Sequence, residues 1–230
     1  MPIVFKTDNA ASYLNTLYTD GTTTLPSGRK LYRHTTLPGS VLCFNDGVDR
    51  SVLILDAKYR IGANDTQKKW GWFGSRHNGN YVLNAPINWN FSDLPDYPNV
   101  LDSTLDSKIR DSYTSRAQTS CLIAPGYKDG YPPEAAQYCR SVIISDNISC
   151  DLPNINTLMR IYVERTYIDE LDPTLEEYPN RSLEKIWEEG GVWSSTGSTS
   201  AEAYMIEKGG IFNKYMISEV GCVVPICEPQ

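Results

Sequence analysis

The residues in this sequence best suited to nucleophilic catalysis or metal binding are six cysteines and two histidines. The cysteines are Cys43, Cys121, Cys139, Cys150, Cys222 and Cys227. No two of them form a CxxC pair, and neither His34 nor His77 has metal-ligand spacing to a cysteine, so the pattern does not indicate a zinc site. A Ser–His or Cys–His pair requires a base in a recognisable motif, and neither histidine lies in one. We therefore expect no catalytic residue, no metal and no cofactor.

Paired carboxylates and glycine-rich stretches also give little support for an enzyme. Glu188–Glu189 and Asp169–Glu170 are neighbours along the chain, so on a helix or turn their side chains do not face each other for acid–base catalysis. Residues 71–74 include two glycines but lack the lysine and the helix N-terminus of a phosphate-binding loop. Cys222 and Cys227 fall on or just after a predicted terminal strand, where packing is the simpler role.

Rings with polar edges are concentrated between residues 60 and 101, among many Gly, Asn, Asp and Pro. They are Trp70, Trp72, His77, Tyr81, Trp89 and Tyr97. Flat rings among short polar side chains are typical of surfaces that bind sugars or proteins. A long segment without hydrophobic periodicity is usually functional or inserted. We interpret these six residues as a candidate binding site; the alternative is that two or three of the rings fill a second core beneath long loops.

The composition limits the classes of partner. The chain has 230 residues, with 28 acidic and 21 basic side chains and a formal net charge of −7. Nonspecific nucleic-acid binding depends on clustered Lys and Arg, so nucleic acid is not an expected partner. No apolar run approaches the roughly 18 to 20 residues that a membrane span needs, so we expect no membrane insertion. Residues 1–8 lack the basic and apolar segments of a secretion signal, which predicts a protein that is not conventionally secreted.

The first part of the chain contains one clear β-hairpin. Two short β-branched runs, 41–44 and 51–55, are joined through residues 45–47, whose Asn, Asp and Gly tolerate positive φ. Residues 1–38 precede this hairpin and contain turn clusters but too few apolar residues for a core of their own. We predict that they form an N-terminal arm for attachment or oligomerisation, followed by one module over 39–230.

The second part predicts a block of helices followed by a block of strands. A helix over 134–140 follows two prolines, a second over 155–162 begins after the capping residue Asn154, and a third over 182–189 ends at Gly190–Gly191. The predicted strands cover 192–196, 203–206, 211–217 and 221–226, with a tight turn at 207–210. Separate blocks of helices and strands indicate an α+β fold.

These motifs, in this order, resemble those of the lectin-like bacterial and phage proteins. The matching segments are Ala135–Cys139, Leu152–Leu158, Val192–Thr196, Ala203–Ile206, Gly209–Gly210 and Gly221–Pro225. That family has an A-x-x-x-C helix, an LP-x-x-x-x-L helix, a WSST strand, an AW-x-V strand, a glycine turn and a final RCVR strand. Tyr204 stands where the family has Trp, and Cys222 lacks the flanking arginines. Residues 39–47 are also similar to the opening hairpin of such modules.

The resemblance implies a C-type-lectin-like fold, with two to three helices packed on small twisted antiparallel sheets and long loops that display a binding surface. It also implies that Cys139 on the first helix faces Cys222 on the last strand. Residues 176–180 are similar to the Glu-Pro-Asn calcium loop of lectins, but an extra Tyr breaks the motif, so we expect a solvated acidic loop. In a cytosolic protein, buried reduced thiols are the default state.

The resemblance implies recognition functions. The first is a non-enzymatic virion structural or recognition protein, such as a phage head or tail fibre or a capsid decoration protein, assembled in the host cytoplasm. Its partners are then other virion proteins, further copies of the chain in a homotrimer, and a cell-surface glycan or protein receptor. The alternative is a secreted bacterial adhesin or glycan-binding lectin at the cell surface. An enzyme on the same scaffold is a third hypothesis and requires a reactive thiol.

Overall fold

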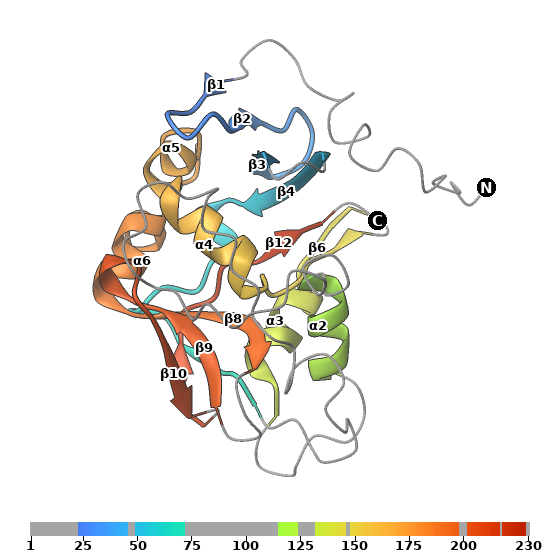
Figure 1. The fold of residues 1–230 in the computed structure, drawn as a ribbon, viewed down its shortest axis with the longest axis vertical. Coiled ribbons are helices and arrows are strands. Elements are labelled where there is room, and N and C mark those ends of the chain that lie inside the picture. The colour runs from blue at the N-terminus through green and yellow to red at the C-terminus, as the bar shows by residue number, and fades with distance from the viewer. Residues whose placement is uncertain are drawn as a thin grey trace, which may run out of the picture.

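The structure is a computed structural model that describes residues 23–45, 49–71, 115–123, 132–145, 148–197, 202–216 and 218–228. In these ranges the chain forms a mixed α+β fold, in which helices pack on small antiparallel sheets (Figure 1). This general class is the one that the sequence predicted.

The largest sheet combines the first described strands with the last one. In spatial order its strands are β1 (Thr23–Thr24), β2 (Lys30–Arg33), β3 (Gly39–Asn45), β4 (Asp49–Leu55) and β12 (Ile226–Cys227). The β3–β4 pair confirms the predicted hairpin, with Val41 opposite Leu53 and Leu42 opposite Val52. Successive side chains on a strand point to opposite faces, and all four of these are fully buried. Both faces of the sheet are therefore covered.

The predicted boundary of the N-terminal arm is corrected by this sheet. β2 pairs with β3, and its Leu31 is buried in the main core. The side chain of Arg29, also buried, donates a hydrogen bond of 2.9 Å to the carboxylate of Glu164 at the junction of two helices. Residues 23–38 are therefore part of the module, because strand pairing and a buried ion pair hold them there. Residues 1–22, the rest of the predicted arm, lie outside the described residues.

The three predicted helices are confirmed. The described α-helices are α2 (Ser115–Ile123), α3 (Glu134–Ser141), α4 (Ile155–Val163), α5 (Arg165–Glu170) and α6 (Leu183–Glu189). The side chain of Asn154 caps α4 by accepting a hydrogen bond from the Thr157 amide at 2.8 Å, and Ser182 caps α6 in the same way at 3.2 Å from Lys185. Among the described residues, no helix is long and apolar enough to cross a membrane.

A second sheet of three antiparallel strands follows the helices. In chain order its strands are β8 (Val192–Gly197), β9 (Glu202–Ile206) and β10 (Phe212–Met216), with β9 in the middle. The turn between β9 and β10 is a 3-10 helix, η6 (Lys208–Gly210). Gly209 and Gly210 have φ values of +78° and +71°, which glycine adopts without steric cost. The Gly-Gly pair therefore specifies the predicted tight turn.

The remaining short elements are η1 (Ala57–Tyr59), β5 (Lys68–Lys69), β6 (Ile143–Ser145), β7 (Ile148–Ser149), η5 (Pro179–Arg181) and β11 (Val220–Gly221).

The predicted strand over 221–226 is divided in the structure. β11 pairs with β5, Val223 forms a bridge with Ile61, and β12 joins β4. Pro225 has no N–H to donate to a ladder, which is consistent with the break in this segment.

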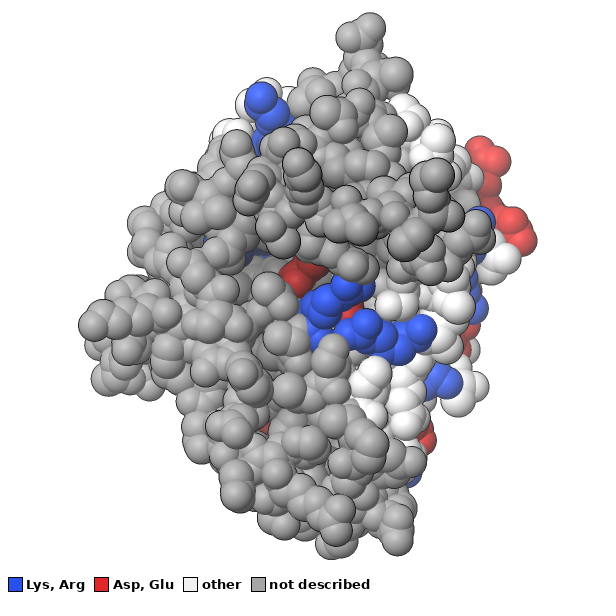
Figure 2. Space-filling view, turned by 90° about the vertical axis from the view of Figure 1, so that its right-hand side faces the viewer, with Lys and Arg blue, Asp and Glu red and all other residues white. Residues whose placement is uncertain are grey.

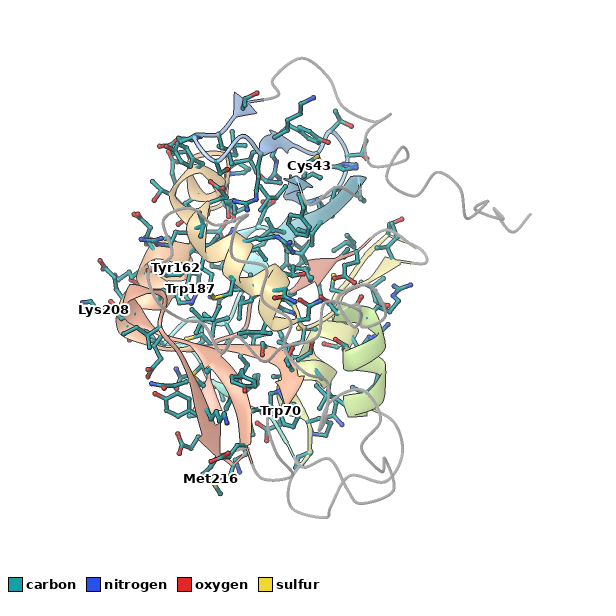
Figure 3. The ribbon with its side chains drawn as sticks, viewed as in Figure 1. Cys43, Trp70, Tyr162, Trp187, Lys208 and Met216 are labelled. Carbon is teal, nitrogen blue, oxygen red and sulfur yellow. The ribbon has the colours of Figure 1, made fainter. Side chains whose placement is uncertain are left out.

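The main core lies where helices α4 and α6 pack against the large sheet and β8–β9. The rings of Tyr162 on α4 and Trp187 on α6 meet edge to face, with centroids 5.3 Å apart and planes 85° to each other (Figure 3). Such aromatic pairs add stability beyond the area that they bury. The contact joins the two helices inside the main core.

A buried arginine joins the large sheet to the helices. Arg60, 1% exposed, forms ion pairs with Asp169 on α5 at 2.9 Å and with Asp172 after it at 3.0 Å. The two carboxylates also accept hydrogen bonds from backbone amides: Asp172 from Ala57 at 2.7 Å, and Asp169 from Leu183 at 2.9 Å. Burial raises the pKa of Asp169, and the Arg60 charge opposes that rise. Removal of Arg60 would leave buried carboxylates without their counter-ion.

We expect Arg60→Met to lower the free energy of unfolding by about 3 to 5 kcal/mol, because it leaves two carboxylates unpaired in the interior. The matched control is Lys185→Met, which removes an exposed pair with Glu189 at 3.7 Å and is expected to change stability by less than about 1 kcal/mol. Urea denaturation of both variants measures the difference. Equal losses would show that Arg60 is no more important to the fold than a surface lysine.

Candidate functional site

Residues 72–114 contain five of the six predicted binding residues, namely Trp72, His77, Tyr81, Trp89 and Tyr97. These residues lie outside the described part of the chain, so their role stays a prediction. The structure describes the residues on either side of this segment, Gly71 and Ser115. The candidate site is therefore defined here by these two attachment points.

A buried tryptophan lies close to the start of this segment in the sequence. Trp70 is 1% exposed, and its indole N–H donates a hydrogen bond of 2.7 Å to the Ser194 carbonyl on β8 (Figure 3). Its ring packs with α2, α3 and Trp193 in a second core cluster. Trp70 was predicted as a surface binding residue, and the structure corrects this: the ring fills the core, as the alternative interpretation held. The reason is that β8 offers a buried acceptor for its N–H.

Gly71, the last described residue before the segment, lies against the start of α3. Its φ is +91°, and a Cβ built on it would lie 2.4 Å from the Cα of Pro133, just before α3. The backbone at Gly71 therefore touches the backbone of Pro133, an approach that only glycine permits. On the other side of the tryptophan, the Lys69 amide donates to the Glu134 carboxylate at 3.1 Å. The backbone at residues 69–71 is therefore held by contacts with both β8 and the start of α3.

On the other side of the segment the first described residue is Ser115, which begins α2. Ser115 is fully buried, and its hydroxyl accepts a hydrogen bond of 2.9 Å from the amide of Asn154. One turn later the hydroxyl of Thr119 both accepts from the Leu152 amide at 3.0 Å and donates to the Leu152 carbonyl at 3.2 Å. These contacts join α2 to the start of α4, which the Leu-Pro motif of the sequence introduces.

The N-terminus of α2 is capped by a carboxylate from the opposite end of the chain. Glu228 accepts hydrogen bonds from the amides of Ser115 at 3.2 Å and Arg116 at 3.4 Å. Burial raises the pKa of Glu228, and the bonds from Ser115 and Arg116 oppose this rise. A negative charge at a helix N-terminus is favourable because of the amides and dipole there. Position 228 therefore supports the point where residues 72–114 return.

Two arginines flank a buried aspartate on the same side of the molecule. Asp151 is fully buried, with Arg140 on α3 at 2.9 Å and Arg116 on α2 at 3.4 Å from its carboxylate. Burial raises the pKa of Asp151, and the two arginines oppose it. Figure 2 looks onto the side where α2 and α3 lie and shows basic side chains gathered beside acidic ones. Arg116 is 30% exposed and Arg140 is 20% exposed, and both neutralise an internal carboxylate.

A separate hollow of about 550 Å³ is lined by residues 33–38, at the connection between β2 and β3. His34 is buried there, and its Nδ1 accepts hydrogen bonds from the amides of Leu37 at 2.9 Å and Thr36 at 3.2 Å. Burial lowers the pKa of His34, and the charge of Arg33 lowers it further. Because Nδ1 already accepts two hydrogen bonds within the turn, it is not available to act as a base.

The cysteines do not adopt the arrangement that the resemblance implied. The thiol of Cys139 is fully buried near Cys150 and Asp151, whereas the sulfur of Cys222 lies 3.5 Å from the side-chain amide of Gln67. Burial raises the pKa of both thiols, which makes the thiolate form less available. Raised pKa values are the opposite of what a nucleophilic cysteine needs.

Sequence reasoning missed the α2 attachment point entirely. Residues 115–123 have no clear apolar stripe, and the partners of Ser115 are far away in the chain, at Asn154 and Glu228.

No group of three or more His, Cys, Asp and Glu side chains in the described residues is arranged to hold a metal ion. The chain matches no protein-family model, and a search of curated proteins finds no similar sequence.

We expect Gly71→Ala to destabilise the protein more than Gly209→Ala. Both positions have positive φ, which costs an alanine about 1 to 2 kcal/mol. A Cβ at Gly209 meets nothing within 4 Å, whereas at Gly71 it overlaps the Pro133 backbone, which adds about 1 to 3 kcal/mol of overpacking. Urea denaturation of the two variants isolates that contact. Equal destabilisation would mean that the Gly71–Pro133 approach does not fix the start of the segment.

Proposed function

We propose that this chain is a non-enzymatic recognition module with a lectin-like fold, whose binding surface is carried by Trp72, His77, Tyr81, Trp89 and Tyr97 within the segment 72–114. The observation that carries the proposal is the attachment of this segment at both ends to the rigid core. Trp70 and Gly71 hold one end, and Ser115 holds the other. Binding loops positioned by a rigid scaffold are the common arrangement for recognition.

The order of elements supports the lectin-like fold within this proposal. The six segments that carry the resemblance fall, in order, on α3, the start of α4, β8, β9, η6 and the stretch from β11 to Pro225. Helices α3 and α4 pack against β8 and β9 through the two larger core clusters. Trp193, the tryptophan of the Trp-Ser-Ser-Thr strand, is fully buried and donates its ring N–H to the Lys68 carbonyl at 2.9 Å.

The setting that we propose for this module is a virion, as a head or tail fibre or a capsid decoration protein. Residues 1–22 then attach the chain to other virion proteins and to further copies of itself in a homotrimer. The apolar side chains available for this in the sequence are Val4, Phe5, Leu14, Leu17 and Tyr18. A symmetric assembly would bury side chains that a single chain leaves in water.

A second candidate function is a secreted bacterial adhesin or glycan-binding lectin. One observation favours it: the sulfur atoms of Cys150 and Cys227 lie 3.0 Å apart in the interior. Disulfides form and persist in oxidising compartments, which a secreted protein enters. The recognition mechanism by residues 72–114 is the same in both candidates, and they differ in where the protein matures.

A glycan array probed with the full chain tests the recognition function, and substitutions identify the surface. We expect Trp72→Ala and Trp89→Ala each to weaken binding about tenfold or more, the effect of a loss of roughly 1.4 kcal/mol or more from a stacked ring. Their melting temperatures are expected to match that of the unmodified chain. The control is Tyr178→Ala, a tyrosine outside the segment that stacks under Arg181. Unchanged binding by both tryptophan variants would refute the assignment of this surface.

Deletion of residues 1–22 tests the proposed assembly. We expect the full chain to sediment as a trimer and the 23–230 chain to sediment as a monomer. The helical signal in circular dichroism is expected to be kept, because the strands from Thr23 onward remain intact. The deletion stops before Leu25 and Arg29, which belong to the core. A trimer that persists after the deletion would remove the role that we assign to these residues.

A further inference from the structure

Two buried cysteines face each other across a short antiparallel pairing. Asp151 and Ile226 form a bridge in which each amide donates to the carbonyl of the other, at 2.7 Å and 3.0 Å. The next pair outward, Cys150 and Cys227, is therefore a non-hydrogen-bonded pair, the position where opposite side chains approach most closely. Their sulfur atoms are 3.0 Å apart. The sulfur atoms are therefore only about 1 Å farther apart than in a disulfide bond.

The pair is closed off from solvent, packed against apolar side chains and close to the buried carboxylate of Asp151. Cys150 is fully buried and Cys227 is 6% exposed, in a small cluster beneath the large sheet that includes Leu53 and Leu55. Among the other described cysteines, Cys43 contacts the hydroxyl of Tyr32 at 3.2 Å, Cys222 contacts Gln67, and Cys139 lies near Cys150 but packs in the second core cluster. Cys150 and Cys227 are thus the thiols that the structure places in direct contact.

We propose that Cys150 and Cys227 form a disulfide bond when the protein meets an oxidising environment. The oxidant that we name is a low-molecular-weight disulfide. One protein thiolate attacks it to give a mixed disulfide and one released thiol, and the second protein thiolate then displaces the other half. Two electrons pass to the small disulfide, and the protons of the two protein thiols end on the two released thiols. The only new bond in the protein joins the two sulfur atoms.

The bond would tie β12 to the residue that directly follows β7. It encloses the chain between positions 150 and 227, which are 77 residues apart, and so removes conformational freedom from the unfolded state. Glu228, the next residue, caps α2 where residues 72–114 rejoin the fold. The cross-link therefore also stabilises this attachment point. The proposal goes beyond the proposed function and stands or fails separately from ligand binding.

Burial governs how fast the bond forms. The contact with Cys150 and burial both raise the pKa of the Cys227 thiol, so little thiolate is present in the folded protein. We expect oxidation to take place during folding or when β12 opens from β4, and to be slow in the closed state. Once formed, the bond is sheltered from reductants by the same burial.

The experiment uses the full chain, purified with reductant and then equilibrated with excess oxidised glutathione, with brief exposure to mild urea to allow opening. Remaining thiols are alkylated and the protein is digested without reductant for mass spectrometry. We expect a linked pair of peptides containing Cys150 and Cys227, with the loss of two hydrogen atoms. We also expect a rise in melting temperature of about 5 °C or more that reductant reverses.

Variants and exchange measurements complete the test. Cys227→Ser is expected to lose both the link and the rise in melting temperature, whereas Cys43→Ser keeps both. Hydrogen exchange of the Ser115 and Arg116 amides is expected to slow on oxidation. Because the peptide map is read on the unmodified chain, it does not depend on how the variants fold. If Cys150 and Cys227 remain alkylatable, or if the link joins Cys139 to Cys222, the proposal is wrong.

Discussion

The last described residues, 220–228, hydrogen-bond in turn to separate parts of the chain, and the positions of the other elements depend on these bonds. β11 pairs with β5, the Cys222 amide donates to Gly191 at 2.8 Å, and the Val223 amide donates to Ile61 at 3.0 Å. β12 then completes the large sheet beside β4, and Glu228 caps α2. One short segment thus connects the two sheets and the helix at which the 72–114 segment returns.

Buried ion pairs hold the helices in place on the large sheet. Arg60 holds α5 and the turn after it against the large sheet, and Arg29 holds Glu164 between α4 and α5. Each of these side chains would be costly to bury alone, so the partners fix one arrangement of helices on sheet. The consequence is a scaffold in which the residues that flank 72–114, Gly71 and Ser115, have fixed positions.

Local signals in the sequence predicted the elements that have local causes. The β-branched run 51–55, the capping residue Asn154 and the Gly-Gly pair at 209–210 each specify their own backbone, and all three elements are confirmed. Other features depend on distant partners: Arg29 meets Glu164 across 135 positions, and β2 becomes a strand because β3 is beside it. The composition of residues 60–101 likewise could not distinguish Trp70, which fills the core, from the other predicted binding residues.

Native-state hydrogen exchange of the amides in the terminal segment tests the account most directly. The amides of Cys222, Val223 and Ile226 donate to three different parts of the chain. If this segment connects the layers, these amides exchange only when the whole protein unfolds, with opening free energies equal to the value from urea denaturation. Exchange of these three amides through local fraying, at much lower free energy while the β3–β4 hairpin stays protected, would contradict the account.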